Sequence, residues 1–189
     1  YIMWNDTFED AQNITEIRIR SSVLGRSIGT WNGSTTNPQY TGASFEGATF
    51  NLPLLSTLEI LCPEKRIRGD FFDPSQSPSL QTLISYSTGW GLDIVDGQGN
   101  ILGTPCPSFA ANQSIRYVDL SDNKFSGNLS LVGLNNLKEF YMGQNILNAV
   151  TGWETLPALE YLTISNNPDL GPDIPNLSFG SPNIRNVAM

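Results

Sequence analysis

A repeat of 22 residues limits the fold of this chain more than any other feature of its sequence. Asparagine returns at positions 123, 145 and 167, and before each Asn the apolar residues keep one spacing, L-x-x-L-x-L-x-x-N-x-L. A period of this size is typical of proteins that stack one structural unit along an axis. The last two apolar positions before the Asn are two residues apart, which is the side-chain period of a β-strand. One such strand cannot bury its apolar side alone, so we predict a stack of units that forms a parallel sheet over a continuous core.

The repeat can be followed over most of the chain, although only its second half is regular. The first apolar residues of the successive copies are Ile14, Leu55, Leu80, Ile115, Leu137, Leu159 and Ile184. The wide spacing of the early copies predicts insertions or loops, which we place at 29–50 and 90–112. A stack of this kind also needs its first unit covered, so we expect 1–13 to form an N-terminal cap.

The recurring asparagine is expected to be structural. A carboxamide both donates and accepts hydrogen bonds, so it can pair with backbone groups that stacking removes from water. A general preference of Asn for turns is the alternative explanation, but it would not hold three Asn residues in one register with the apolar positions. We therefore predict an inward-facing ladder of Asn123, Asn145 and Asn167.

These motifs resemble those of the leucine-rich repeat family. Segments after the Asn position, FSGNL (125–129) and LGPDIP (170–175), are similar to the L-x-G-x-I-P segment of plant-type extracellular members, where it forms a second short strand. The resemblance implies an α/β-type repeat solenoid, a leucine-rich repeat horseshoe with a parallel concave β-sheet, mostly β and coil with few helices. It implies a single domain over 1–189. Because an apolar pattern runs to the last residue, we expect a fragment of a longer protein.

Charge and composition exclude several classes of function. The chain has 18 acidic and 10 basic residues and a formal net charge of −8. Such a surface repels phosphate backbones and anionic lipids, so we expect no nucleic-acid partner and no membrane contact by this segment. The chain has no histidine, which removes His-based nucleophile pairs, His metal sites and the commonest general base.

A catalytic role would therefore have to depend on carboxylates. Asp119, Asp122 and Glu139 are the nearest candidates, because a pair of carboxylates can hydrolyse a glycoside. On a repeat scaffold these three are expected to be solvated residues of an exposed face. We predict that the chain is not an enzyme and that it holds no cofactor.

The segment LDIVDGQGNILG, at 92–103, interrupts the repeat. Its Asp-Gly and Gly-Asn pairs favour tight turns, so we predict a β-hairpin that leaves the stack. A calcium loop through Asp93, Asp96 and Asn100 is the alternative. It lacks the D-x-D-x-D-G spacing and a closing Glu, and we therefore predict no metal site.

Two weak features favour an oxidising, extracellular environment or the surface of a cell or particle. The glycosylation sequon N-x-S/T begins at Asn5, Asn13, Asn32, Asn112, Asn128 and Asn176. The two cysteines, Cys62 and Cys106, would be able to form a disulfide there. Two buried thiols are the interpretation that we favour over a bonded pair.

The repeat register also predicts which side chains project from the outer face of the sheet, because alternate residues of a strand point to opposite sides. Four of the six tyrosines fall on this face. Tyrosine offers a large contact area at low entropy cost, and beside carboxylates it also suits sugar rings. The alternative is that Tyr is simply favoured in strands. The candidate ligand-binding residues are Tyr86, Tyr117, Asp119, Glu139, Tyr141, Tyr161 and Thr163.

Together with the family resemblance, these features predict a non-catalytic extracellular recognition module, such as an adhesion or receptor domain. Its concave face would bind a protein partner or, as a second choice, a glycan. The alternative is a structural spacer or assembly unit of a larger surface fibre or filament. Homo- or hetero-assembly would then use the open C-terminal repeat, whose apolar edge needs a neighbour.

Overall fold

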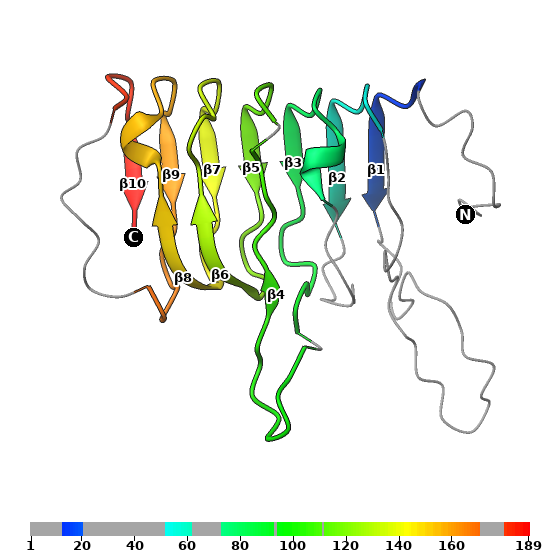
Figure 1. Cartoon of the computed structure of the whole chain (residues 1–189), viewed down its shortest axis with the longest axis vertical. Helices are drawn as coiled ribbons and strands as arrows, with labels where there is room; N and C mark the ends of the chain where they lie inside the picture. The colour runs from blue at the N-terminus through cyan, green and yellow to red at the C-terminus, as the bar shows by residue number, and fades with distance from the viewer. Residues whose placement is uncertain (1–12, 21–51, 62–72, 93, 111, 171–179) are drawn as a thin grey trace.

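A computed structural model describes residues 13–20, 52–61, 73–92, 94–110, 112–170 and 180–189, which form a stack of short parallel strands (Figure 1). Seven strands make one sheet in the order β1-β2-β3-β5-β7-β9-β10. They are β1 (Glu16–Arg20), β2 (Thr57–Leu61), β3 (Thr82–Ile84), β5 (Tyr117–Asp119), β7 (Glu139–Tyr141), β9 (Tyr161–Thr163) and β10 (Asn186–Ala188). The predicted parallel solenoid is confirmed.

A second, smaller sheet has three parallel strands in the order β4-β6-β8. These are β4 (Thr104–Pro105), β6 (Phe125–Ser130) and β8 (Ile146–Thr151). Strand β6 contains the FSGNL segment, so the second short strand expected there is confirmed. In the described part of the chain, the only named helices are two 3₁₀ turns, η2 (Pro74–Gln76) and η3 (Trp153–Thr155).

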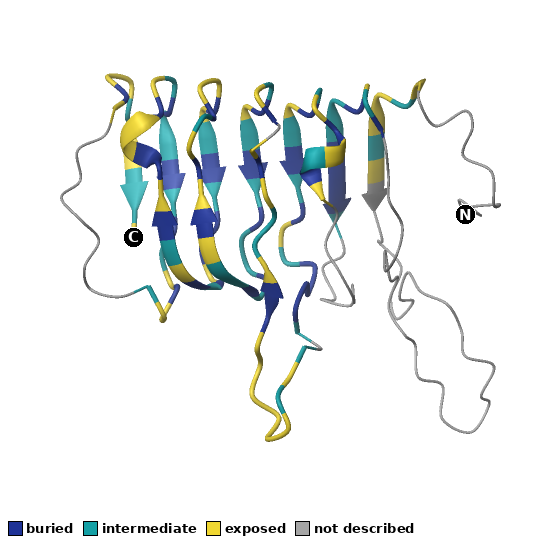
Figure 2. Ribbon diagram, in the orientation of Figure 1, coloured by how far each residue is buried: buried dark blue, intermediate teal, exposed yellow. Residues whose placement is uncertain are grey.

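The register predicted from the repeat is also confirmed. Tyr117 pairs with Glu139, and Glu139 pairs with Tyr161, in three successive strands of the large sheet. Each of these strands buries its middle residue and leaves the two flanking residues half-buried, as the alternating colours of Figure 2 show. The apolar positions therefore face the core, and the positions between them form the outer face of the sheet.

Residues of both sheets contribute to one hydrophobic core. Val118 and Phe140 come from the large sheet, while Phe125 and Leu129 come from the small one, and all four are at most 1% exposed. Phe109, from the segment before β5, makes an edge-to-face contact with Phe140, with ring centroids 6.3 Å apart. The core is continuous along the stack because each coil adds side chains at the same positions as its neighbour.

Asn145 shows how the asparagine position holds successive coils together. Its carboxamide oxygen accepts a hydrogen bond from the backbone N–H of Phe125 at 2.9 Å. Its amide nitrogen donates to the carbonyls of Leu120 at 3.0 Å, Met142 at 3.2 Å and Gly143 at 3.2 Å. The side chain is 1% exposed. One side chain therefore pairs four backbone groups from two coils that water does not reach.

The same arrangement recurs at the other ladder positions. Asn167 accepts from Leu147 N at 3.0 Å and donates to the carbonyls of Met142 and Ile164. Asn123 accepts from three successive backbone N–H groups, those of Thr88, Gly89 and Trp90. Both side chains are buried.

The coil before Asn123 carries a substituted version of the repeat that sequence analysis did not identify. Thr88 takes the place of the Asn, and the hydroxyl of Ser85 takes the place of an apolar residue. Both are fully buried. The Thr88 hydroxyl donates to Asn123 Oδ1 at 3.0 Å, and the indole N–H of Trp90 donates to Ser85 Oγ at 2.7 Å. Trp90 supplies the apolar volume that Ser85 lacks.

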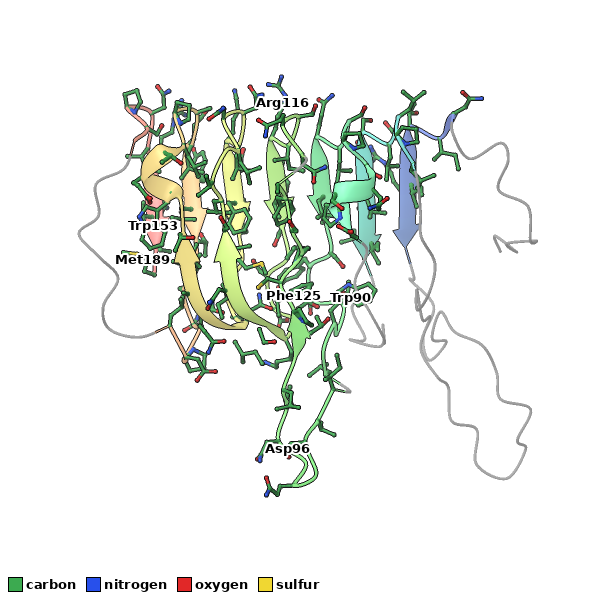
Figure 3. All side chains as sticks on the ribbon, in the orientation of Figure 1. Trp90, Asp96, Arg116, Phe125, Trp153 and Met189 are labelled. Atoms are coloured by element: carbon green, nitrogen blue, oxygen red, sulfur yellow. The ribbon has the colours of Figure 1, made fainter. Side chains whose placement is uncertain are left out.

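The predicted β-hairpin is confirmed over 94–102. Val95 and Ile101 form an antiparallel bridge, and the N–H of Asp96 donates to the carbonyl of Asn100 at 2.9 Å. The hairpin projects beyond the strands, and Asp96 lies near its tip (Figures 1 and 3). The rest of the segment expected to be an insertion is part of the coil, because β4 pairs with β6 and Phe109 lies in the core. Residues 1–12 of the expected cap and the expected loop at 29–50 lie outside the described residues.

We expect the Asn145→Ala substitution to lower the free energy of unfolding by roughly 2–4 kcal/mol, because it leaves buried backbone donors and acceptors without partners. Urea unfolding followed by circular dichroism would measure the change. Asn135→Ala is the matched control, since Asn135 is exposed, and its effect should stay within about 0.5 kcal/mol. Equal losses for the two variants would show that the buried carboxamide does not hold the coils together.

Candidate functional site

The central strands of the large sheet bring most of the predicted ligand-binding residues onto one face. One row across β5, β7 and β9 reads Tyr117, Glu139 and Tyr161, and the row beside it reads Asp119, Tyr141 and Thr163. All six residues are half-buried. Neighbouring strands lie about 4.8 Å apart, so tyrosines and carboxylates alternate in both directions across β5 and β7.

Four of these residues form what we call the tyrosine–carboxylate cluster: Tyr117, Asp119, Glu139 and Tyr141. The rings of Tyr117 and Tyr141 have centroids 5.7 Å apart and are tilted by 46°. The hydroxyl of Tyr141 donates a hydrogen bond to Glu139 Oε2 at 2.8 Å. The cluster is thus an ordered surface of two aromatic rings with a carboxylate beside each of them.

Burial shapes the electrostatics of the cluster. It raises the pKa of Asp119, although hydrogen bonds from Ser121, including one from its N–H at 3.1 Å, act in the opposite direction. Burial also raises the pKa of Tyr117, and the charges of Asp119 and Glu139 raise it further. The pKa of Tyr141 is raised by burial and then by its hydrogen bond to Glu139. At neutral pH both phenols therefore remain protonated beside the acidic side chains.

No cation balances these carboxylates within the part of the chain that the structure describes. Neither Asp119 nor Glu139 forms an ion pair there, whereas the acidic residues toward the ends of the sheet do. On β1, Nε of Arg18 lies 3.3 Å from a carboxylate oxygen of Glu16, and its Nη1 lies 3.6 Å from a carboxylate oxygen of Glu59 on β2. Arg116 directly precedes β5, but it lies at the edge where the strands begin (Figure 3). Within the described residues, the centre of the face therefore carries negative charge without an ion-pair partner.

The other predicted binding residues take different positions. Tyr86 is 47% exposed and follows β3, outside the ring contact of the cluster. Tyr161 and Thr163 lie on β9, where Thr163 is the strand neighbour of Tyr141. The ion pair between Arg18 and Glu59 was not singled out from the sequence. The repeat alignment holds the signal for it, because the two opposite charges occupy the same position in successive copies.

The carboxylate of Asp96 holds the turn of the hairpin together by hydrogen bonds. It accepts hydrogen bonds from Gln98 N at 2.8 Å, from Asn100 N at 2.9 Å and from Asn100 Nδ2 at 2.8 Å. The bonds from Asn100 are the main reason that its pKa is lowered. Asp93, the third ligand of the alternative calcium loop, lies outside the described residues. Among the residues that are described, no three His, Cys, Asp or Glu side chains are grouped to hold a metal ion.

The structure bears on two of the modification sites considered from the sequence. Asn112 begins a sequon, but it is fully buried and its amide nitrogen donates to the carbonyls of Pro74 at 2.9 Å and Ser77 at 2.7 Å. A glycan on that nitrogen is incompatible with the fold. Cys106 is a free thiol, as the interpretation of two thiols expected, and burial raises its pKa to about 12.

The remaining modification sites divide into exposed ones and ones that are not described. Asn13 and Asn128 are exposed. Cys62 and three sequon residues, Asn5, Asn32 and Asn176, lie outside the described residues. None of the helices in the described part of the chain is long and apolar enough to cross a membrane.

Comparisons of the chain with models of protein families, with curated proteins and with solved structures gave no match.

We expect Asp119→Asn to raise the thermal stability of the chain at neutral pH. Because the folded-state pKa of Asp119 is raised, its contribution to stability is fully present below the unfolded-state pKa and is lost as pH rises through the folded-state pKa. At pH 7 its charge is therefore a cost that the amide avoids, while the amide oxygen can still accept from Ser121. Thermal melts between pH 3 and 7 should show a gain that grows with pH. Asp169→Asn is the control, because Asp169 is exposed. If the wild type were more stable than Asp119→Asn at pH 7, the expectation would be contradicted.

We also expect the folded chain to carry no glycan at Asn112 when it is expressed through a eukaryotic secretory pathway. Its amide nitrogen is buried and already bonded, whereas the exposed Asn128 is accessible. Peptide mass spectrometry of the secreted, folded fraction would map occupancy at each sequon. A glycan at Asn112 in protein that melts like the unmodified chain would contradict the structure.

Proposed function

We propose that the chain is an extracellular leucine-rich repeat protein and that its large sheet lines the concave side of a horseshoe. Support comes from the L-x-x-L-x-L-x-x-N-x-L units, from the parallel register of their strands, and from the buried asparagine ladder. The small sheet formed by β4, β6 and β8 adds support, since it stands where plant-type members of that family have a second strand.

We propose further that the chain is a non-catalytic recognition module and that it binds a protein partner through the outer face of β5, β7 and β9. The observation that carries the proposal is the tyrosine–carboxylate cluster. Half-buried tyrosine rings already held in place by their neighbours lose little entropy on binding, and such residues often dominate the energy of protein interfaces. A stacked sheet also offers a long surface on which several of these residues act together.

A protein partner fits this face better than a glycan does. Tyr117 and Tyr141 are half-buried and their rings lie against each other, with centroids 5.7 Å apart, so the cluster offers a small stacking surface that suits one flat side chain better than a larger sugar ring. A side chain of a partner needs less room and can reach the ring edges and the carboxylates together. The glycan and a purely structural role are outcomes that the following experiment separates.

The test uses the immobilised full chain to select binders from a display library of random peptides, with a glycan array screened in parallel. We expect peptide binders that lose affinity about 30-fold for each tyrosine removed by Tyr117→Ala or Tyr141→Ala, which corresponds to roughly 2 kcal/mol per residue. Affinities would be measured by surface plasmon resonance, and thermal melts would verify that the variants are folded.

Val132→Ala combined with Leu54→Ala is the matched control, because both residues are exposed and apolar but lie outside the outer face of the strands. Binders that tolerate the tyrosine substitutions as well as they tolerate this control would contradict the recognition proposal. Selection of glycans alone would replace the protein partner with a glycan. A chain that selects nothing and forms filaments would favour the structural spacer.

A further inference from the structure

The charge pattern of the outer face narrows the chemistry of the partner. Over β5, β7 and β9 the side chains of the two outward rows include only two charged groups, Asp119 and Glu139, and both are acidic. Among the described residues that occupy these outward rows, the next cation along the sheet is Arg18 on β1, three strands from β5. At about 4.8 Å per strand this is roughly 14 Å, which exceeds the screening length of about 8 Å at physiological ionic strength. Arg18 therefore cannot neutralise the cluster.

The tyrosines of the cluster make its negative potential suitable for one kind of group. A cation is attracted to the face of an aromatic ring, and the attraction grows when water is excluded. Here each ring lies beside a carboxylate in the neighbouring strand, Tyr117 beside Glu139 and Tyr141 beside Asp119. The hydrogen bond that Tyr141 donates to Glu139 fixes that carboxylate against the ring system. A single cation placed over the cluster would meet both attractions at once.

From this arrangement we infer that the protein partner presents a basic side chain, with arginine as the best fit, to the cluster formed by Tyr117, Asp119, Glu139 and Tyr141. The inference rests on the proposed recognition function and specifies what that face recognises. A guanidinium group is planar, stacks on aromatic rings and donates paired hydrogen bonds to carboxylates. Lysine offers the same charge without the flat shape, so it should bind more weakly.

The other classes of ligand fit less well. A neutral glycan would leave the two carboxylates without a counter-charge while covering them, which is costly for buried charge. An anionic ligand would be repelled by the cluster and by the net charge of −8 over the chain. The same net charge would steer a basic partner toward the molecule and make association sensitive to salt.

The first test examines the peptides selected on the wild-type chain and measures their affinity at low and high ionic strength. We expect enrichment of arginine over the starting library and weaker binding at high salt. Replacing the arginine of a selected peptide with lysine should weaken binding several-fold, and replacing it with alanine should weaken binding at least tenfold.

The second test removes the charges of the cluster without changing its shape. Asp119→Asn and Glu139→Gln should each weaken binding of an arginine-containing peptide roughly 10- to 100-fold, as expected when one partner of a desolvated charge pair is lost. Because Asp119→Asn is expected to stabilise the fold, its loss of binding cannot be attributed to unfolding. Asp169→Asn and Glu154→Gln are the controls, since both carboxylates are exposed and lie outside the cluster.

A third measurement reports on the contact itself. The pKa of the Asp119 carboxyl, followed by carbon NMR of the labelled full chain, should fall when an arginine-containing peptide is added, because a nearby positive charge favours the ionised form. A peptide with alanine in place of the arginine should leave this pKa unchanged.

The outcomes separate this inference from the recognition proposal. Binders that require Tyr117 and Tyr141 but lack basic residues, and that tolerate Asp119→Asn, would overturn the inference and leave the recognition proposal standing. A glycan that binds the face and tolerates Asp119→Asn would overturn it as well. Failure to obtain any binder that depends on the tyrosines would overturn both.

Discussion

The structure depends on one interaction, the hydrogen bonding of a buried asparagine to the backbone of the preceding coil. Stacking strands in one direction forces the chain to turn inward after each strand, and the turn carries backbone groups into a region without water. Asn145 pairs with four such groups. One of them is the N–H of Phe125, which is the first residue of β6 in the small sheet. The same side chain thus satisfies the turn and sets where the second strand of the neighbouring coil begins. Apolar packing drives the stack together, and the asparagine ties each turn to the backbone of the preceding coil.

The register of the stacked strands has a direct consequence for the outer face. Because Asn145 and the apolar positions of each coil point inward, the residues between them must point outward, and stacking places equivalent outward residues side by side. Tyr117, Glu139 and Tyr161 are far apart in the sequence yet lie in one row of the sheet. The stacking requires no particular residue at these outward positions, so they can vary without disturbing the core.

The described fold was largely predictable from the sequence, because the repeat specifies both the strand direction and the alignment of neighbouring strands. The hairpin at 94–102 was predictable for a local reason, since Asp96 and the glycines after it favour a tight turn. The sequence did not predict the coil in which Thr88 stands in the Asn position and Ser85 stands in an apolar position of the repeat. There Ser85 and Trp90 replace the usual apolar residue through a hydrogen bond and a large ring, and a pattern search for leucine and asparagine does not recognise that solution. The sequon at Asn112 misled for a similar reason. A sequon specifies three residues, but it does not show that the amide is hydrogen-bonded inside the fold.

The sequence predicted where the residues of the candidate site lie, but it did not predict how far they are buried or what that burial costs in stability. Aligning the repeat copies placed Asp119 on the outer face, where a solvated carboxylate would not lower the stability of the fold. The alignment could not show that neighbouring residues bury this carboxylate. Burial raises the pKa of this carboxyl, which means that its charge opposes folding at neutral pH. A side chain that only had to be tolerated on the surface would gain from being an amide or from an adjacent cation, as Glu59 gains from Arg18. Among the described residues the centre of the sheet keeps this acidic charge without an ion-pair partner, and the resulting cost in stability supports the proposal that a partner covers this face.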